Sequence, residues 1–152
     1  MRTVLAALLT AALLPALGAE KAELTIPRLS SAPALEDFLS MVPTPEFAGM
    51  ARVDGGFVQR DPEDGEPASQ HTDVYLGYDQ QNLYVIFVAF DDEPDKIRSH
   101  LSRRDSVHGD DIVEIQIDTF LDHRQAYTFL TNPAGVHWDA IWKEGSEFDR
   151  SW

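Results

Sequence analysis

In the second half of the chain, apolar side chains recur at every second position, which is the period of a β-strand. Val74, Leu76 and Tyr78 form the first such series, and residues 79–82 are turn formers. The next run, residues 83–90, is apolar at successive positions, which is typical of a strand covered on both faces. The pattern predicts a β-hairpin whose second strand lies at the centre of a sheet, between two layers.

A second hairpin is predicted further along. Residues 111–118 alternate again, with Val113, Ile115 and Ile117 on one face and mostly polar side chains on the other. Two more strand-like runs flank Asn132-Pro133-Ala134-Gly135, whose residue types favour a tight connection between antiparallel strands. Repeated short strands with hardly any amphipathic helix predict an all-β fold, an antiparallel β-sandwich or jelly roll.

The N-terminal residues 1–19 differ from the rest. Arg2 precedes an apolar run, residues 4–17, that is shorter than the ~20 residues needed to span a bilayer. The run ends in the small residues Gly18 and Ala19, so we predict a signal peptide that is cleaved after one of them. The alternative is an uncleaved N-terminal anchor.

Two regions follow the predicted leader. Residues 20–56 are interrupted by prolines and glycines, and we predict an irregular N-terminal arm with one helical turn over residues 35–41. Residues 57–152 are assigned to the β-sandwich domain, since a chain of this length suits one domain. We expect a monomer.

The chain is strongly acidic, with 12 basic and 26 acidic residues and a net charge of −14. Loss of Arg2 with the leader lowers this to −15. Such a surface repels phosphate groups, so nucleic acid and anionic membranes are excluded as partners, and a neutral ligand or a cation is favoured. Cysteine is absent, so an exported form would fold without disulfides. These features suit a bacterial protein of the periplasm or cell envelope.

A series of short phrases then follows in a fixed order: Asp61-Pro62, Gly65-Glu66-Pro67-Ala68-Ser69, Thr72-Asp73-Val74-Tyr75, Gly77-Tyr78-Asp79, Asn82-Leu83-Tyr84-Val85, Arg103-Arg104-Asp105, Asp110-Asp111, Asp118-Thr119-Phe120, Asp122-His123-Arg124 and Asn132-Pro133-Ala134-Gly135. Together they resemble the family nine carbohydrate-binding domain, in the variant found at the N-terminus of bacterial envelope proteins that continue into a large C-terminal region. The chain departs from that pattern at Val53-Asp54-Gly55-Gly56, which lacks the Trp that usually follows. It also stops at Trp152 inside a Phe-Asp-x-x-Trp phrase, so the sandwich is expected to be incomplete at its C-terminal end.

The resemblance implies a non-catalytic domain that binds an oligosaccharide or polysaccharide, in an exported protein associated with glycan breakdown or uptake. It also implies a structural calcium, and an outer-membrane barrel encoded downstream as a partner.

Sugar binding requires aromatic plates together with fixed hydrogen-bonding groups. Trp138 and Trp142 are four residues apart and so share one face of a strand, where either would stack on a sugar ring. Their alternative role is core packing. Arg103 and Arg104 precede a predicted strand, with Arg104 as the first polar contact or else a surface ion pair. Asn132 is a further candidate, with turn capping as its alternative.

Calcium prefers oxygen ligands, and Asp91, Asp92, Asp110 and Asp111 are candidates for holding it. Their spacing is not that of an EF-hand. The alternative is that these carboxylates belong to solvated turns.

Three other functions compete with sugar binding. A glycoside hydrolase would need a carboxylate pair such as Glu114 and Asp118, but four strand residues separate them by ~13 Å, more than the ~6.5–9.5 Å of inverting enzymes. Haem binding would need axial ligands, and the methionines after the leader, Met41 and Met50, lie in the predicted arm. The third alternative is a structural or gating N-terminal domain of an outer-membrane protein without sugar affinity.

Overall fold

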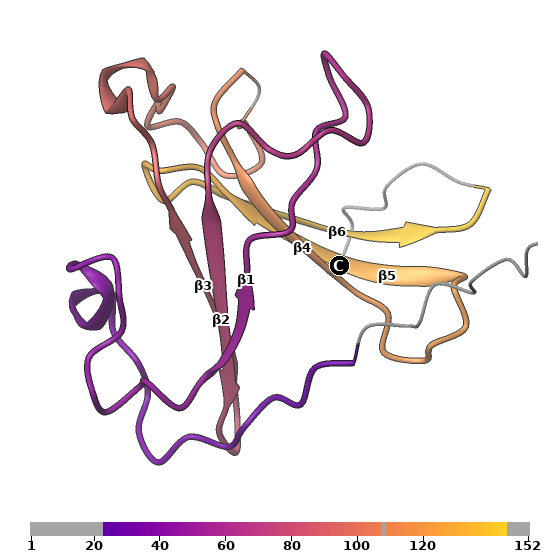
Figure 1. Cartoon of the computed structure of the whole chain (residues 1–152). Helices are drawn as coiled ribbons and strands as arrows, with labels where there is room; N and C mark the ends of the chain where they lie inside the picture. Colours follow the sequence, from indigo (N-terminus) through magenta and orange to yellow (C-terminus); the bar gives the residue numbers. More distant parts are fainter. Residues whose placement is uncertain (1–22, 108, 146–152) are drawn as a thin grey trace, which may run out of the picture.

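The computed structural model describes residues 23–107 and 109–145 and shows an all-β chain built from two three-stranded antiparallel sheets (Figure 1). The predicted all-β antiparallel fold is confirmed. The first sheet has the order β1-β2-β3, and the second has the order β4-β5-β6. The elements are η1 (Leu35–Phe38) and η2 (Pro94–Lys96), both 3-10 helices, and the strands β1 (Ala51–Asp54), β2 (Thr72–Tyr78), β3 (Leu83–Ala89), β4 (Val113–Ile117), β5 (Gln125–Thr131) and β6 (His137–Lys143).

Both predicted hairpins are present. The β2–β3 turn closes through the Asp79 N–H, which donates to the Asn82 carbonyl at 3.0 Å. The β5–β6 turn closes through the Gly135 N–H, which donates to the Asn132 carbonyl at 3.0 Å. Gly135 has a φ of 76°, a conformation that glycine adopts without steric cost.

The position of β3 differs from the prediction. Within the described residues β3 lies at the edge of its sheet, and β2 occupies the centre with residues 73–77 all buried. The remaining edge, β1, comes from the segment that the proline and glycine pattern marked as irregular. β3 is apolar on both faces because one face meets the N-terminal arm and the other meets a cleft between the sheets. The apolar residues on both faces of β3 therefore correctly predicted contacts on both sides of this strand. They wrongly predicted that β3 is the central strand of its sheet.

The N-terminal arm supplies the main buried cluster of the first sheet. Phe38, Phe47 and Met50 of the arm pack against Tyr75 and Val88 of the sheet, and the rings of Phe38 and Tyr75 are 5.4 Å apart. The arm is also attached through its backbone, because the Leu29 N–H donates to the Tyr78 carbonyl at 2.7 Å.

Gly77 leaves room for the Leu29 side chain of the arm beside β2. A Cβ at this position would come within 2.7 Å of that side chain, so Leu29 would have to shift if a larger residue replaced Gly77.

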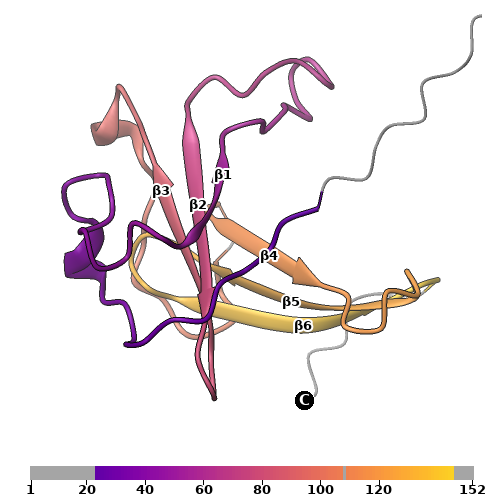
Figure 2. The same cartoon turned by 60° about the horizontal axis from the view of Figure 1, so that its bottom comes forward.

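The strands of the second sheet run across those of the first (Figures 1 and 2). Between the sheets lies an open cleft of about 540 Å³ with mostly apolar walls. Its first wall is formed by Leu83, Val85 and Phe87 of β3. The other wall comes from β4 and β5, chiefly Val113, Ile115, Ile117, Tyr127 and Phe129. In the described part of the chain, no helix has the length and apolar character needed to cross a membrane.

Candidate functional site

Both candidate tryptophans lie in β6, at positions that share one face as predicted. Trp138 is the register partner of Leu130, and Trp142 is the partner of Ala126. Ala140 stands between the two tryptophans and is fully buried opposite Thr128. Each tryptophan is half-buried, so each ring contributes to packing and retains some accessible surface.

Arg104 lies against β6 because its loop is attached there: the Asp105 N–H donates to the His137 carbonyl at 3.0 Å. The Arg104 side chain is exposed and forms a hydrogen-bonded ion pair with Asp139 of β6. A second carboxylate, that of Asp105, lies 4.0 Å from Arg104 Nε.

The ion pair belongs to a small pocket, which we call the Arg104 pocket. It has a volume of about 360 Å³ and is lined by Arg104, Phe129, Leu130, His137, Trp138 and Asp139. Arg104 and Trp138 both line this pocket, although Trp138 and Asp139 are consecutive in β6 and therefore lie on opposite faces of its sheet. Arg103 and Trp142 are not part of this lining.

Asn132 is buried and fully engaged within the protein. Its side-chain amide donates to the His100 carbonyl at 2.9 Å and to Asp110 Oδ2 at 2.7 Å. Its carbonyl oxygen accepts from the Val136 N–H at 2.8 Å. Asn132 therefore joins the β5–β6 turn to the loop before β4, which corresponds to the turn-capping alternative.

Three of the four aspartates proposed for calcium, Asp91, Asp110 and Asp111, accept hydrogen bonds from the protein. Asp110 accepts bonds from His100 and Asn132, and these lower the pKa of the Asp110 carboxyl to about 2. Asp111 accepts from the backbone and guanidinium of Arg98, which lowers its pKa as well. Asp91 accepts from the Glu93 N–H at 2.7 Å. Across residues 23–107 and 109–145, the predicted calcium ligands do not form a group of three or more metal-capable side chains.

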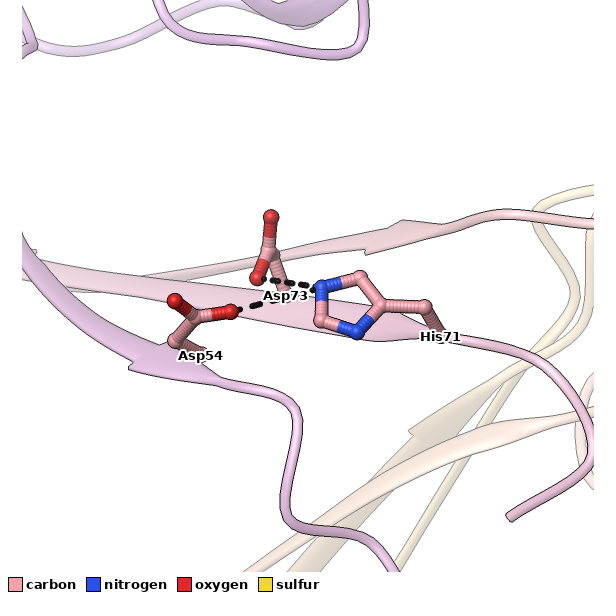
Figure 3. A group of neighbouring side chains, drawn as sticks. All are labelled: Asp54, His71 and Asp73. Carbon is pink, nitrogen blue, oxygen red and sulfur yellow. Dashed lines mark hydrogen bonds and ion pairs between the residues drawn. The ribbon is translucent and has the colours of Figure 1, made fainter.

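Three side chains that could together bind a metal ion lie at the end of β1 and the start of β2. Asp54, His71 and Asp73 each offer one ligand atom, and the three atoms lie within 4.8 Å of one another (Figure 3). His71 Nε2 is 3.0 Å from Asp73 Oδ1 and 3.5 Å from Asp54 Oδ1. Asp73 is buried, whereas the other two residues are exposed.

Arg52 also contacts this group. Its NH2 atom is 2.8 Å from Asp73 Oδ2 and 3.3 Å from Asp54 Oδ1. The hydrogen bond from Arg52 lowers the pKa of Asp73 against the opposing effect of burial. This cluster was not predicted from the sequence, because Asp54 lies in the segment interpreted as an irregular arm. The alternation of His71 and Asp73, which places both on one face of an extended segment, was the available signal.

The structure also describes Glu114 and Asp118, the two carboxylates considered for a glycoside hydrolase. Glu114 lies on the exposed face of β4 and accepts from Gln116 Nε2 at 2.7 Å. Asp118 accepts the backbone N–H groups of Phe120, Leu121 and His123, and these bonds lower its pKa. A general acid of a glycosidase needs a raised pKa, so Asp118 is unsuited to that role.

Comparison of the chain with protein-family models, with curated proteins and with solved structures finds no match. The fold itself defines the class of protein: an all-β chain of two antiparallel three-stranded sheets. The resemblance to the family nine carbohydrate-binding domain stays a prediction.

Proposed function

We propose that this protein is a carbohydrate-binding domain that holds a sugar without cleaving it, at the Arg104 pocket. The observation that carries the proposal is the pocket that the Arg104–Asp139 pair shares with Phe129, the register partner of Asp139, and with Trp138. A sugar ring presents apolar C–H faces and a rim of hydroxyl groups. An aromatic surface beside a charged donor and acceptor complements both.

The size and the charge of the pocket are consistent with this ligand. Its volume of about 360 Å³ lies within the ~300–1,000 Å³ typical of small-molecule sites. The guanidinium of Arg104 supplies fixed N–H donors, and the carboxylate of Asp139 supplies acceptors. The pair also neutralises itself, which suits an uncharged ligand better than an ionic one.

Location forms a further part of the proposal. We propose that the domain acts outside the cytoplasm, in the periplasm or cell envelope, within a system for glycan breakdown or uptake. This rests on the leader predicted over residues 1–19, which lies outside the described residues, as does Trp152.

Calorimetric titration with xylan- and cellulose-type oligosaccharides tests the proposal. Trp138→Ala and Arg104→Lys are each expected to weaken binding by about tenfold or more, which equals ~1.4 kcal/mol. Lysine keeps the charge but loses the planar fork, so Arg104→Lys should leave the melting temperature nearly unchanged. Phe120→Ala and Arg60→Lys, exposed positions away from the pocket, serve as matched controls and should bind like the parent protein.

Two results would contradict the proposal in different ways. If both pocket variants bind the sugar as tightly as the parent protein, binding occurs elsewhere on the domain. If a broad glycan array detects no binding by the folded parent protein, the domain has a structural role within an outer-membrane protein instead.

A further inference from the structure

We propose that Asp54, His71 and Asp73 form a binding site for a divalent transition-metal ion of the zinc class. The distances between the ligand atoms support it. Tetrahedral coordination with metal–ligand bonds of 2.0–2.2 Å separates neighbouring ligand atoms by about 3.4 Å. His71 Nε2 lies 3.0 Å from Asp73 Oδ1 and 3.5 Å from Asp54 Oδ1, close to this value, and all three ligand atoms lie within 4.8 Å of one another.

The backbone holds the three residues in place. Asp54 and Asp73 are register partners on β1 and β2, so their carboxylates face each other directly. Like charges in this arrangement are destabilising unless a cation lies between them. The third ligand, His71, is tied to the far end of β3 because its carbonyl accepts the Phe90 N–H at 2.9 Å.

The surroundings of the His71 ring are also specific. The ring packs against Phe90, with centroids 5.5 Å apart. On another side, a Cβ at Gly55 would lie 3.0 Å from His71 Cε1 and Nδ1, so glycine leaves the ring the space it occupies. These contacts direct Nε2, and not Nδ1, toward the two carboxylates.

The donor set selects the class of metal. One imidazole nitrogen and two carboxylate oxygens suit zinc and its first-row neighbours, which accept mixed nitrogen and oxygen ligands. Calcium takes six to eight oxygen ligands, so this site does not fit the calcium expected from the family resemblance. Three protein ligands leave a fourth position for water. A pocket of about 380 Å³, lined in part by Gly55, Gly56 and His71, adjoins the site.

Arg52 would compete with a metal ion for the carboxylates of Asp54 and Asp73. Its guanidinium contacts Asp54 Oδ1, one of the atoms that a metal would bind, and also Asp73 Oδ2. The Arg52 side chain is about half exposed, so it can move into solvent on metal binding, with loss of its contacts with Asp73 and with the Tyr75 ring, whose centroid is 6.0 Å from the guanidinium carbon. In the absence of metal, the single charge of Arg52 offsets part of the charge of the two facing carboxylates. Metal binding and the Arg52 contact with Asp54 therefore exclude each other.

The test is titration of Zn²⁺ into the untagged protein without sugar, with calorimetry to measure affinity and melting in Zn²⁺ against chelator to measure stabilisation. His71→Gln and Asp54→Asn, both at exposed positions, are expected to lower Zn²⁺ affinity by about tenfold or more, because loss of a ligand costs at least as much as loss of an outer-shell partner. Arg52→Gln is expected to raise the affinity. His123→Gln, at an exposed histidine in another loop, should bind Zn²⁺ like the parent protein.

Removal of the Arg52 guanidinium favours any divalent cation near the two carboxylates, so the response of His71→Gln is what separates a metal site from a plain ion-pair network: loss of the imidazole lowers Zn²⁺ affinity only if Nε2 is a ligand. The proposal is overturned if Arg52→Gln binds Zn²⁺ no more tightly than the parent protein. It is also overturned if His71→Gln retains the parent affinity, because the ion then binds elsewhere. The outcome is independent of sugar binding, since the Arg104 pocket shares no residue with this cluster.

Discussion

At the scale of single residues, the buried polar groups show how closely this chain matches donors to acceptors. The buried polar residues within the described part of the chain are Asp73, Asn132 and Thr128. Asp73 is paired with Arg52 and His71, and the side chain of Asn132 makes three hydrogen bonds. Thr128 is different, because its Oγ1 is buried and has no hydrogen-bond partner. An unmade hydrogen bond at a buried hydroxyl costs free energy.

Thr128→Val should therefore stabilise the protein. Valine keeps the shape of the side chain and removes the unsatisfied hydroxyl, so we expect the free energy of unfolding to rise by about 1 kcal/mol. Thr128→Ser keeps the hydroxyl and loses the methyl group, so it should lower the free energy of unfolding by about 1 kcal/mol. Urea denaturation of the three proteins measures both changes. A less stable Thr128→Val would show that Oγ1 has a partner in solution.

Some features of the candidate residues could be predicted from neighbouring positions in the sequence, and others could not. The shared face of Trp138 and Trp142 follows from the two-residue period of a strand and was predictable. The pairing of Arg104 with Asp139 joins residues 35 positions apart and depends on how a loop folds back onto β6. To predict that Asp54 and Asp73 pair, the register of β1 against β2 must be known. The prolines and glycines of this segment favoured irregular structure, so β1 itself was not predicted. Sequence periodicity therefore predicted which face of a strand a side chain lies on, but not which residues far apart in the sequence are in contact.

At the scale of elements, the hairpins were predictable because their turns are encoded locally. Asp79 is the clearest example. Its carboxylate accepts the N–H groups of Gln81 and Asn82, each at 2.7 Å, and the Tyr84 hydroxyl at 2.7 Å. These bonds, led by that from the Gln81 backbone, lower the pKa of Asp79 to about 2. The order of strands in a sheet has no such local signal, which is why β3 was wrongly placed at the centre.

The Asp79 turn should make stability depend on pH in acid. The pKa of Asp79 is about 2 in the folded protein and ~3.9 in an unfolded chain, so the unfolded state takes up the proton first as pH falls. The contribution of Asp79 is complete above about pH 4 and disappears as pH falls toward 2. Asp79→Asn removes this titration, so its melting temperature should fall less steeply between pH 4 and pH 2.

Tyr84→Phe provides the graded control for this turn. It removes one of the bonds to the Asp79 carboxylate and leaves the two backbone bonds in place, so the pKa of Asp79 should rise part of the way toward its usual range. Carboxyl titration by NMR would show this shift directly. Parallel melting curves for Asp79→Asn and the parent protein across this pH range would contradict the assignment.

At the scale of the whole molecule, packing is uneven between the two faces of the first sheet. The first sheet has the aromatic cluster of the N-terminal arm on one face. Its other face borders the open cleft, where Leu83 and Phe129 remain more than a third exposed. Local stability in proteins follows buried contacts and protected hydrogen bonds. The most stable part of this molecule should therefore be the strand that has neighbours on both edges and the arm cluster on its face, which is β2.

Native-state hydrogen exchange tests this arrangement residue by residue. Residues 73–76 of β2 have register partners in both β1 and β3, so successive amides of this stretch are directed at a neighbouring strand and should exchange slowly. Along β3, only alternate amides face β2, because an antiparallel pair uses every second N–H of each strand. We therefore expect continuous protection over residues 73–76 and an alternating pattern over β3. Continuous protection over β3, equal to that of β2, would mean that a further strand pairs with its outer edge and that β3 is central after all.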